Sequence, residues 1–142
     1  MERSLVLIKP DGIERGLTGD IVGRLEKAGL KLVAAKMLRL DRPLAERHYA
    51  IHAEKPFFKA LLEYITSGPV LATVFETPGA VELIREIMGK TDPAQAQAGT
   101  IRSDYGLDIE RNTIHGSDSA ESAEKEIALF FSADEIQSYE RK

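Results

Sequence analysis

The segment ERNTIHGSDSAESAEKE, residues 110–126, contains the last of the three histidines of the chain, His115, beside Gly116 and several small hydroxyl residues. A histidine becomes an effective nucleophile or base when one ring nitrogen faces the substrate and a hydrogen bond fixes the other. Glu126 is the candidate for fixing the ring, and Ser117 can hydrogen-bond a transferred oxygen or the same carboxylate. The segment therefore predicts catalytic chemistry at His115. A surface loop that leads into a helix cap is the alternative interpretation.

A second group of residues is cationic. Lys9 ends the first apolar run, and Arg85 and Arg102 follow much later, with Thr91 and Asn112 near them in sequence. Arginine pairs bidentately with phosphate oxygens, and lysine contributes a point charge. If these side chains face one place, they form an anion-binding pocket. For any one of them taken alone, a solvated surface charge is the favoured interpretation.

Two histidines and two aromatic residues allow more than one interpretation. His48 and His52 are spaced like residues one helical turn apart, which is a spacing that can bind metal. No third ligand accompanies them in sequence, so we interpret both as surface or helix-packing residues and predict no protein-held metal site. Tyr49 and Phe57 are either core aromatics or a hydroxyl and a flat face offered to a ligand.

Composition, charge and length narrow the class of protein. The 142 residues predict one domain, spanning 1–142, and the absence of cysteine excludes disulfides and thiolate metal sites. The net charge of −4 disfavours nucleic acid as the main partner. The apolar run Leu5 to Ile8 is too short for a signal peptide or a membrane span, so we expect a cytoplasmic protein without a membrane partner. GKT at 89–91 lacks the preceding glycine of a phosphate-binding loop, because Ile84 occupies that position.

The order of predicted elements indicates the fold class. Apolar runs predict strands, amphipathic segments bounded by proline and glycine predict helices, and residues 90–117 show no sustained period and are predicted to be a long functional loop. Asp118 and Glu121 resemble a capping box that opens a short helix, and the acidic end after Ser132 is predicted to be a surface helix. The strands are expected at 4–9, 30–40, 69–76 and 127–131, and the longer helices at 18–29, after Pro43, at 56–68 and at 78–89.

This order predicts an α/β (α+β) protein with a ferredoxin-like βαββαβ sandwich. Its sheet would have four antiparallel strands covered by helices on one face, with the long loop preceding the segment that contains His115.

Over nearly its whole length the chain resembles the nucleoside diphosphate kinase family, in its short prokaryotic form. The NxxHGSDS pattern around His115 is highly specific to that family. The blocks that carry the resemblance are IKPDGIERGLTGDI (8–21), HYAIHAEKPFF (48–58), TSGPVLATVFE (66–76), GTIRSDYG (99–106) and NTIHGSDSAESAEKEIALFF (112–131).

The resemblance implies a reaction. Members transfer the γ-phosphate of a nucleoside triphosphate to a nucleoside diphosphate by a ping-pong route, with transient phosphorylation of the histidine that matches His115. Mg²⁺ is expected as the cofactor and travels with the nucleotide phosphates, so no dedicated metal cage is needed. The resemblance also implies a homo-oligomer, and it leaves hexamer and tetramer open.

Site residues follow from the resemblance position by position. Lys9 would contact the ribose 3′ region and the transferring phosphate. Arg85, Thr91 and Arg102 would hold the diphosphate, and Asn112 would bind the sugar.

The resemblance also implies which residues bind the base and which residues support the ring of His115. Phe57 would stack on one face of the base with Ile109 opposite, which suits an enzyme that accepts many bases. Tyr49 would help to position the phosphate near His115, and Ser117 and Glu126 would support the ring.

The chain departs from the family pattern at two places. Asp92-Pro93 stands where many members have Asn-Pro, in a loop that contributes to subunit contacts in the family, so the departure bears on the expected assembly more than on catalysis. The chain ends at Lys142, without the longer tail of many eukaryotic members. A catalytically silent nucleotide-binding or regulatory module of the same fold is the alternative function, although such a module usually loses the histidine or its supporting residues.

Overall fold

One four-stranded sheet organises the computed structural model, which describes residues 1–142. Its strands are β1 (Glu2–Ile8), β2 (Lys31–Leu38), β3 (Val70–Thr77) and β4 (Ile114–Gly116), in the order β2-β3-β1-β4. All three pairings are antiparallel. The order and direction of the strands confirm the predicted ferredoxin-like class. Strand β1 is therefore central, with β3 on one side and the very short β4 on the other.

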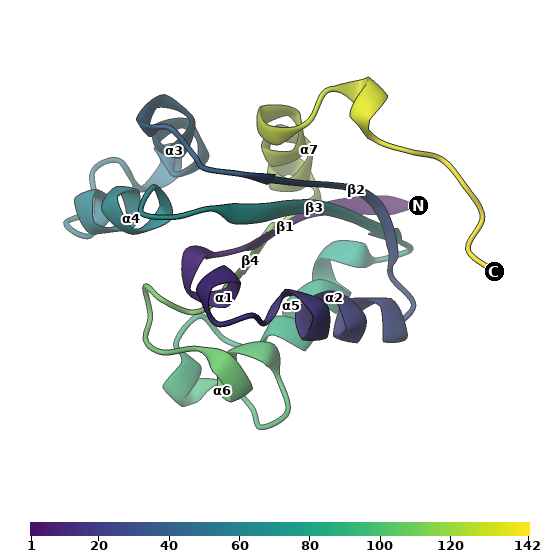
Figure 1. Cartoon of the computed structure of the whole chain (residues 1–142), viewed down its shortest axis with the longest axis horizontal. Helices are drawn as coiled ribbons and strands as arrows, with labels where there is room; N and C mark the ends of the chain where they lie inside the picture. Colours follow the sequence, from purple (N-terminus) through teal and green to yellow (C-terminus); the bar gives the residue numbers. More distant parts are fainter.

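Helices cover both faces of the sheet, and not one face as predicted (Figure 1). Side chains of β1 alternate between two cores, with Leu5 and Leu7 in one and Val6 and Ile8 in the other. An apolar run of this kind is typical of a strand buried on both faces. The first face carries α3 (Arg42–His48), α4 (Phe58–Ile65) and α7 (Ala120–Phe130), and the second carries α1 (Pro10–Glu14), α2 (Thr18–Lys27), α5 (Ala80–Met88) and α6 (Ile101–Tyr105).

The prediction of a strand at 127–131 was wrong, because these residues complete and follow helix α7. A short apolar run fits a strand and a buried helix turn equally well. Here the preceding residues are strong helix formers, and Ala123, Ile127 and Phe130 recur at helical spacing against the core. Ser119 caps the helix by accepting a hydrogen bond from the Ser122 N–H at 3.0 Å, in place of the predicted capping box.

The segment 90–117 contains more regular structure than predicted. It contains the 3₁₀ turn Pro93–Gln95, helix α6 and the fourth strand β4. Three residues are too few to show an alternating pattern, so nothing in the sequence distinguishes β4 from a loop.

The end of the chain also differs from its prediction. The expected surface helix is only the 3₁₀ turn Ala133–Glu135, closed by a capping box between Ser132 and Glu135. The remaining residues run beside β2, where the Gln137 N–H donates to the Val33 carbonyl at 2.8 Å. No helix in the structure has the length and apolar character required to span a bilayer.

Candidate active site

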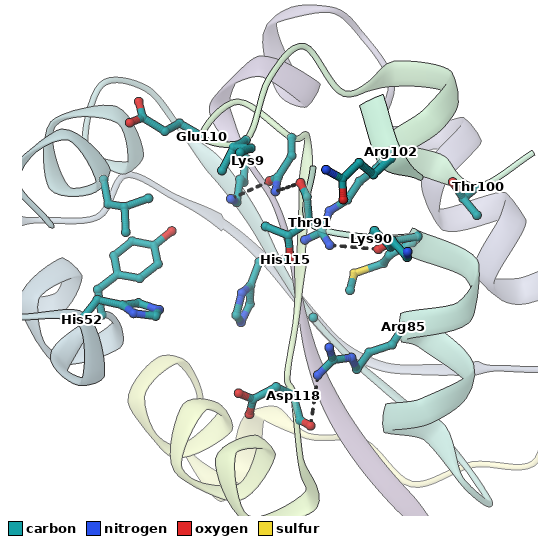
Figure 2. A pocket seen from close by; sticks show the side chains of 18 of the residues that line it. Lys9, His52, Arg85, Lys90, Thr91, Thr100, Arg102, Glu110, His115 and Asp118 are labelled. Atoms are coloured by element: carbon teal, nitrogen blue, oxygen red, sulfur yellow. Dashed lines mark hydrogen bonds between the residues drawn. The ribbon is translucent and has the colours of Figure 1, made fainter. Parts of the chain in front are cut away.

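A cleft of about 1170 Å³ brings together nearly all of the predicted site residues (Figure 2). This volume is slightly larger than the roughly 300–1,000 Å³ that is usual for a small-molecule site. Ser117 is the exception, because it is fully buried behind the cleft wall. The predicted residues that line the cleft are Lys9, Tyr49, Phe57, Arg85, Thr91, Arg102, Ile109, Asn112, His115 and Glu126.

His115 is held by hydrogen bonds that lead back into the central strand. Its position on β4 pairs it with Leu7 of β1, and Glu126 reaches it from helix α7. The distance from His115 Nε2 to Glu126 Oε1 is 2.9 Å, and the Ser117 hydroxyl donates to the same oxygen at 2.8 Å. The Leu5 N–H in turn donates to Ser117 Oγ at 3.2 Å. The ring is therefore fixed through Nε2 and still partly exposed to the cleft, with 21% of the His115 side chain accessible.

The backbone just before His115 turns sharply at Thr113. This residue has φ of 76°, which is rare for a β-branched side chain, and the Ile114 N–H donates across it to the Asn112 carbonyl at 2.9 Å. The Thr113 hydroxyl donates to the buried Asp11 carboxylate at 2.7 Å. The Lys9 N–H donates to the Thr113 carbonyl at 2.8 Å. These hydrogen bonds hold the turn against the start of α1. Asn112 and the partly exposed His115 lie on the two sides of the turn.

Lys9 is the most deeply buried cation of the cleft. Its ammonium group donates to Asn112 Oδ1 at 2.8 Å, and the Asn112 amide donates to the Thr91 carbonyl at 3.0 Å. Burial, with a further contribution from the nearby Arg102, lowers the pKa of Lys9 to about 8. No carboxylate is bonded to the ammonium, so the site is ready to stabilise an anion.

The two arginines differ in how firmly they are held. Arg102 is buried and donates to the carbonyls of Gly89 at 3.1 Å and Ile114 at 2.7 Å, while its Nε has no partner. Burial and the neighbouring Arg85 lower the pKa of Arg102 to about 10, which leaves it charged at neutral pH. Arg85 is exposed and donates to the Asp118 carbonyl at 3.2 Å. Its side chain extends from α5 toward the His115 side of the cleft (Figure 2).

One part of the cleft rim, here called the mouth, exposes apolar side chains. Phe57 is 41% exposed and Ile109 is 58% exposed, and both line the cleft. Neither side chain can form a hydrogen bond, so the mouth offers flat and branched apolar surface without directional contacts.

The spacing of His48 and Tyr49 in the sequence did not indicate where they lie relative to His115. His48 ends α3, whereas His52 lies in the separate 3₁₀ turn Ala50–His52, so the expected pair on one helix does not form. Instead the His48 ring meets the His115 ring edge to face, with centroids 4.7 Å apart. His48 is 8% exposed and neither of its ring nitrogens has a hydrogen-bond partner. The Tyr49 hydroxyl is likewise buried without a partner, and burial raises the pKa of that phenol.

Sequence reasoning did not single out several other lining residues, among them Lys90, Thr100 and Glu110 (Figure 2). Lys90 adds another positive charge, and Glu110 lies near the Lys9 end of the cleft. Polar residues in an aperiodic segment carry no signal that separates a cleft wall from ordinary surface, so only the fold identifies them.

Known proteins match both the sequence and the architecture. The pattern that defines the family described as nucleoside diphosphate kinase matches residues 2–136. A nucleoside diphosphate kinase of Dehalococcoides mccartyi is 58% identical over 142 residues, covering 100% of both chains. That of Archaeoglobus fulgidus is 58% identical over 141 residues, covering 99% of this chain and 93% of the relative.

A solved structure agrees with these matches. The halophilic nucleoside diphosphate kinase of Halobacterium salinarum in complex with CDP superimposes with a TM-score of 0.96 at 53% identity. The superposition covers 99% of this chain and 93% of that one. The chain therefore belongs to the nucleoside diphosphate kinase family, whose members are phosphotransferases that bind nucleoside di- and triphosphates.

Proposed function

We propose that this chain transfers the γ-phosphate of a nucleoside triphosphate to a nucleoside diphosphate through a phosphohistidine at His115. The observation that carries the proposal is the 2.9 Å contact between His115 Nε2 and Glu126, on the wall of a cleft that also contains Lys9 and Arg102. Glu126 accepts the Nε2–H and thereby leaves the lone pair on Nδ1 free to attack.

The reaction divides into two like halves. In the first, His115 Nδ1 attacks the γ-phosphorus, a N–P bond forms, and the bond from phosphorus to the bridging oxygen breaks with release of the nucleoside diphosphate. In the second, a terminal oxygen of the acceptor diphosphate attacks the same phosphorus and the N–P bond breaks. No proton has to leave the ring, because Glu126 stabilises the positive charge that the ring gains.

Charge and position supply the rate enhancement. Lys9, Arg85, Thr91 and Arg102 hold the phosphates, and Asn112 binds the sugar. Preorganised cations stabilise the charge that develops on transferring phosphoryl oxygens, and they need no reorganisation during the reaction. The hydrogen bonds that already fix Lys9 and Arg102 support these roles.

The remaining residues complete the nucleotide site. Phe57 and Ile109 take the two faces of the base, and Tyr49 helps to position the phosphate. Ser117 and Glu126 hold the ring of His115, as their shared hydrogen bonds support. Apolar contact with the base favours acceptance of several nucleotides.

Mg²⁺ is part of the proposal as a companion of the nucleotide. The ion prefers an octahedral shell of oxygens, and it commonly uses one or two carboxylates with substrate phosphates. In this chain the one group of three candidate metal ligands near one another is His48, His115 and Glu126, which supplies only one carboxylate. The donor set therefore fits Mg²⁺ held mainly by nucleotide phosphates, where it neutralises their charge.

The proposal treats residues 1–142 as one catalytic domain within a homo-oligomer. Exposed apolar residues outside the cleft, such as Met37 on the edge strand β2, support contact between copies. Hexamer and tetramer both remain open.

The deciding experiment is a single-turnover incubation with ATP and Mg²⁺, without acceptor, followed by intact-mass analysis of the native chain and of His115→Ala. We expect one added phosphate that is acid-labile and leaves when a nucleoside diphosphate is added. The variant should bind nucleotide and acquire no phosphate. Absence of the adduct in a native chain that binds nucleotide would contradict the phosphohistidine route and favour a silent binding module.

A further inference from the structure

Three side chains from separate elements converge beside the cleft. His48 comes from the end of α3, His115 from β4 and Glu126 from α7. Each offers one candidate metal-ligand atom, and these atoms all lie within 4.8 Å of one another. Two of the three already have a place in the proposed reaction, whereas His48 has none.

His48, the member of this cluster without a role in the proposed reaction, has no hydrogen-bond partner in the protein. His48 is buried, and neither its Nδ1 nor its Nε2 has a hydrogen-bond partner. Buried polar groups are usually paired because an unmade hydrogen bond costs about 1–3 kcal/mol. The ring packs against His115, Tyr49 and Phe130, so no protein donor or acceptor satisfies it. An unpartnered imidazole beside a second imidazole and a carboxylate is the donor set of a zinc site.

We propose that His48, His115 and Glu126 form a binding site for a single Zn²⁺-class transition-metal ion, and that the bound ion blocks phosphorylation of His115. Three protein ligands with an open fourth position are typical of zinc sites that face a cleft. Imidazole nitrogens suit Zn²⁺, Ni²⁺ and Cu²⁺, whereas Mg²⁺ prefers oxygen ligands and does not compete here.

The required movement is small. Metal–ligand bonds of roughly 2.0–2.2 Å in a tetrahedral shell place ligand atoms roughly 3.3–3.5 Å apart. His115 Nε2 and Glu126 Oε1 are 2.9 Å apart and have to separate slightly to admit the ion. The three ligand atoms lie within 4.8 Å of one another, so the His48 ring has to approach by at most about 1.5 Å. His48 is the last residue of α3 and precedes a 3₁₀ turn, so the ring can approach without breaking a helix.

Metal binding at this position replaces a proton. The His115 Nε2–H gives its proton to solvent, and the ion takes its place between the ring and Glu126. The ion then draws electron density from the ring that must act as the nucleophile, and Glu126 no longer accepts from Nε2. The binding of the ion stands on geometry alone, whereas the block of phosphorylation rests on the function proposed above.

The direct test is calorimetric titration of the metal-free full chain with Zn²⁺ in the absence of nucleotide. We expect one site per chain in the native protein, and an affinity at least about tenfold lower in His48→Gln, because loss of even an outer-shell partner typically costs 10–100-fold. The matched control is His52→Gln, which removes a nearby histidine outside the cluster and should bind Zn²⁺ like the native chain. No binding to the native chain, or equal affinity in His48→Gln, would overturn the proposal.

A second measurement uses only the native chain and does not depend on folding of the variant. In an NMR titration with Zn²⁺, the ring resonances of His48 and His115 should shift together, and those of His52 should remain in place. Shifts at His52 alone, or at none of the three rings, would contradict the site.

The inhibitory effect is measured separately. Pre-incubation with saturating Zn²⁺ should lower phosphate incorporation at His115 at least about tenfold, and a chelator should restore it. Phosphorylation that is unaffected by an ion shown to occupy the site would overturn the block. If the native chain never acquires phosphate without Zn²⁺, the proposed reaction fails, and the binding experiments still decide the metal site.

Discussion

The inner end and the mouth of the cleft are built in opposite ways. At the inner end, His115, Lys9 and Arg102 are joined by hydrogen bonds to Glu126, Asn112 and two backbone carbonyls. At the mouth, Phe57 and Ile109 are exposed apolar side chains without directional contacts. Polar groups that must stabilise a particular charge at a particular point need to be fixed, whereas a stacking surface needs only to be flat and present.

Under the proposed function, the fixed inner end would recognise the phosphates and the apolar mouth would tolerate different bases. Misplacing a fixed cation by an ångström weakens its interaction with the transition state, while an apolar face accepts many rings. The two ends should therefore respond differently to substitution, in both the size of the effect and the kinetic constant that changes.

The largest effect is expected at the inner end. Lys9→Met removes the buried ammonium while keeping a similar shape, and kcat should fall by about 10²–10³-fold, as for loss of one preorganised charge. Steady-state kinetics with saturating donor and acceptor measure it. Lys90→Met is the matched control. This lysine lines the cleft but forms no hydrogen bond to the chain around His115, so kcat should change by less than about threefold. Equal effects of both substitutions would remove the distinction between fixed and peripheral cations.

A smaller effect of a different kind is expected at the mouth. Phe57→Ala removes a stacking face worth about 1–3 kcal/mol, so KM should rise by about tenfold for purine and pyrimidine nucleotides alike, with kcat nearly unchanged. Phe57→Tyr keeps the flat ring and should retain a KM close to that of the native chain. A fall in kcat in Phe57→Ala with constant KM would show that the mouth positions the reacting phosphate and does more than hold the base.

The smallest effect is a dependence on pH that belongs only to the inner end. In the proposed reaction the charged form of Lys9 binds phosphate. The pKa of Lys9 is lowered to about 8, so kcat/KM should fall severalfold between about pH 7 and 8.5. This decline should be absent in Lys9→Met and preserved in Phe57→Ala.

The stability of the ligand-free protein depends on pH in the opposite direction to kcat/KM. Lysine in the unfolded chain has a pKa near 10.5, so between pH 8 and 10.5 the unfolded state binds more protons than the folded state. The contribution of Lys9 to the free energy of unfolding therefore increases as pH rises through this range. Thermal denaturation of the native chain against Lys9→Met measures it, and a contribution that decreased with pH would contradict the lowered pKa.

Residue types and order were sufficient to predict that His115 and Glu126 are partners. His115 beside small residues, with Glu126 as its partner, follows from side-chain chemistry, and the structure places the two in contact. The spacing of Lys9, Arg85 and Arg102 left open whether they share one place, because their convergence depends on how the strands are ordered. The resemblance to the family predicted that these side chains converge, and all three residues line the cleft.

The errors have identifiable physical causes. Residues 127–131 are an apolar run whose helical or extended state depends on what precedes it, and β4 is too short for any periodic signal. Glu126 was nevertheless assigned correctly as the neighbour of His115, although it reaches the ring from a helix. His48 was paired with His52 because local spacing is all that one sequence displays, whereas its true neighbour is brought to it by the fold.

The central position of β1 has a consequence for biosynthesis. Its first residues leave the ribosome at the start of translation, but its neighbours β3 and β4, and the helix that carries Glu126, follow only much later. Contacts between segments so distant in sequence form slowly, because the long intervening chain must first be closed into a loop. A nascent chain thus cannot form the contact between His115 and Glu126 until residue 126 has emerged, so the proposed activity has to await that point of synthesis.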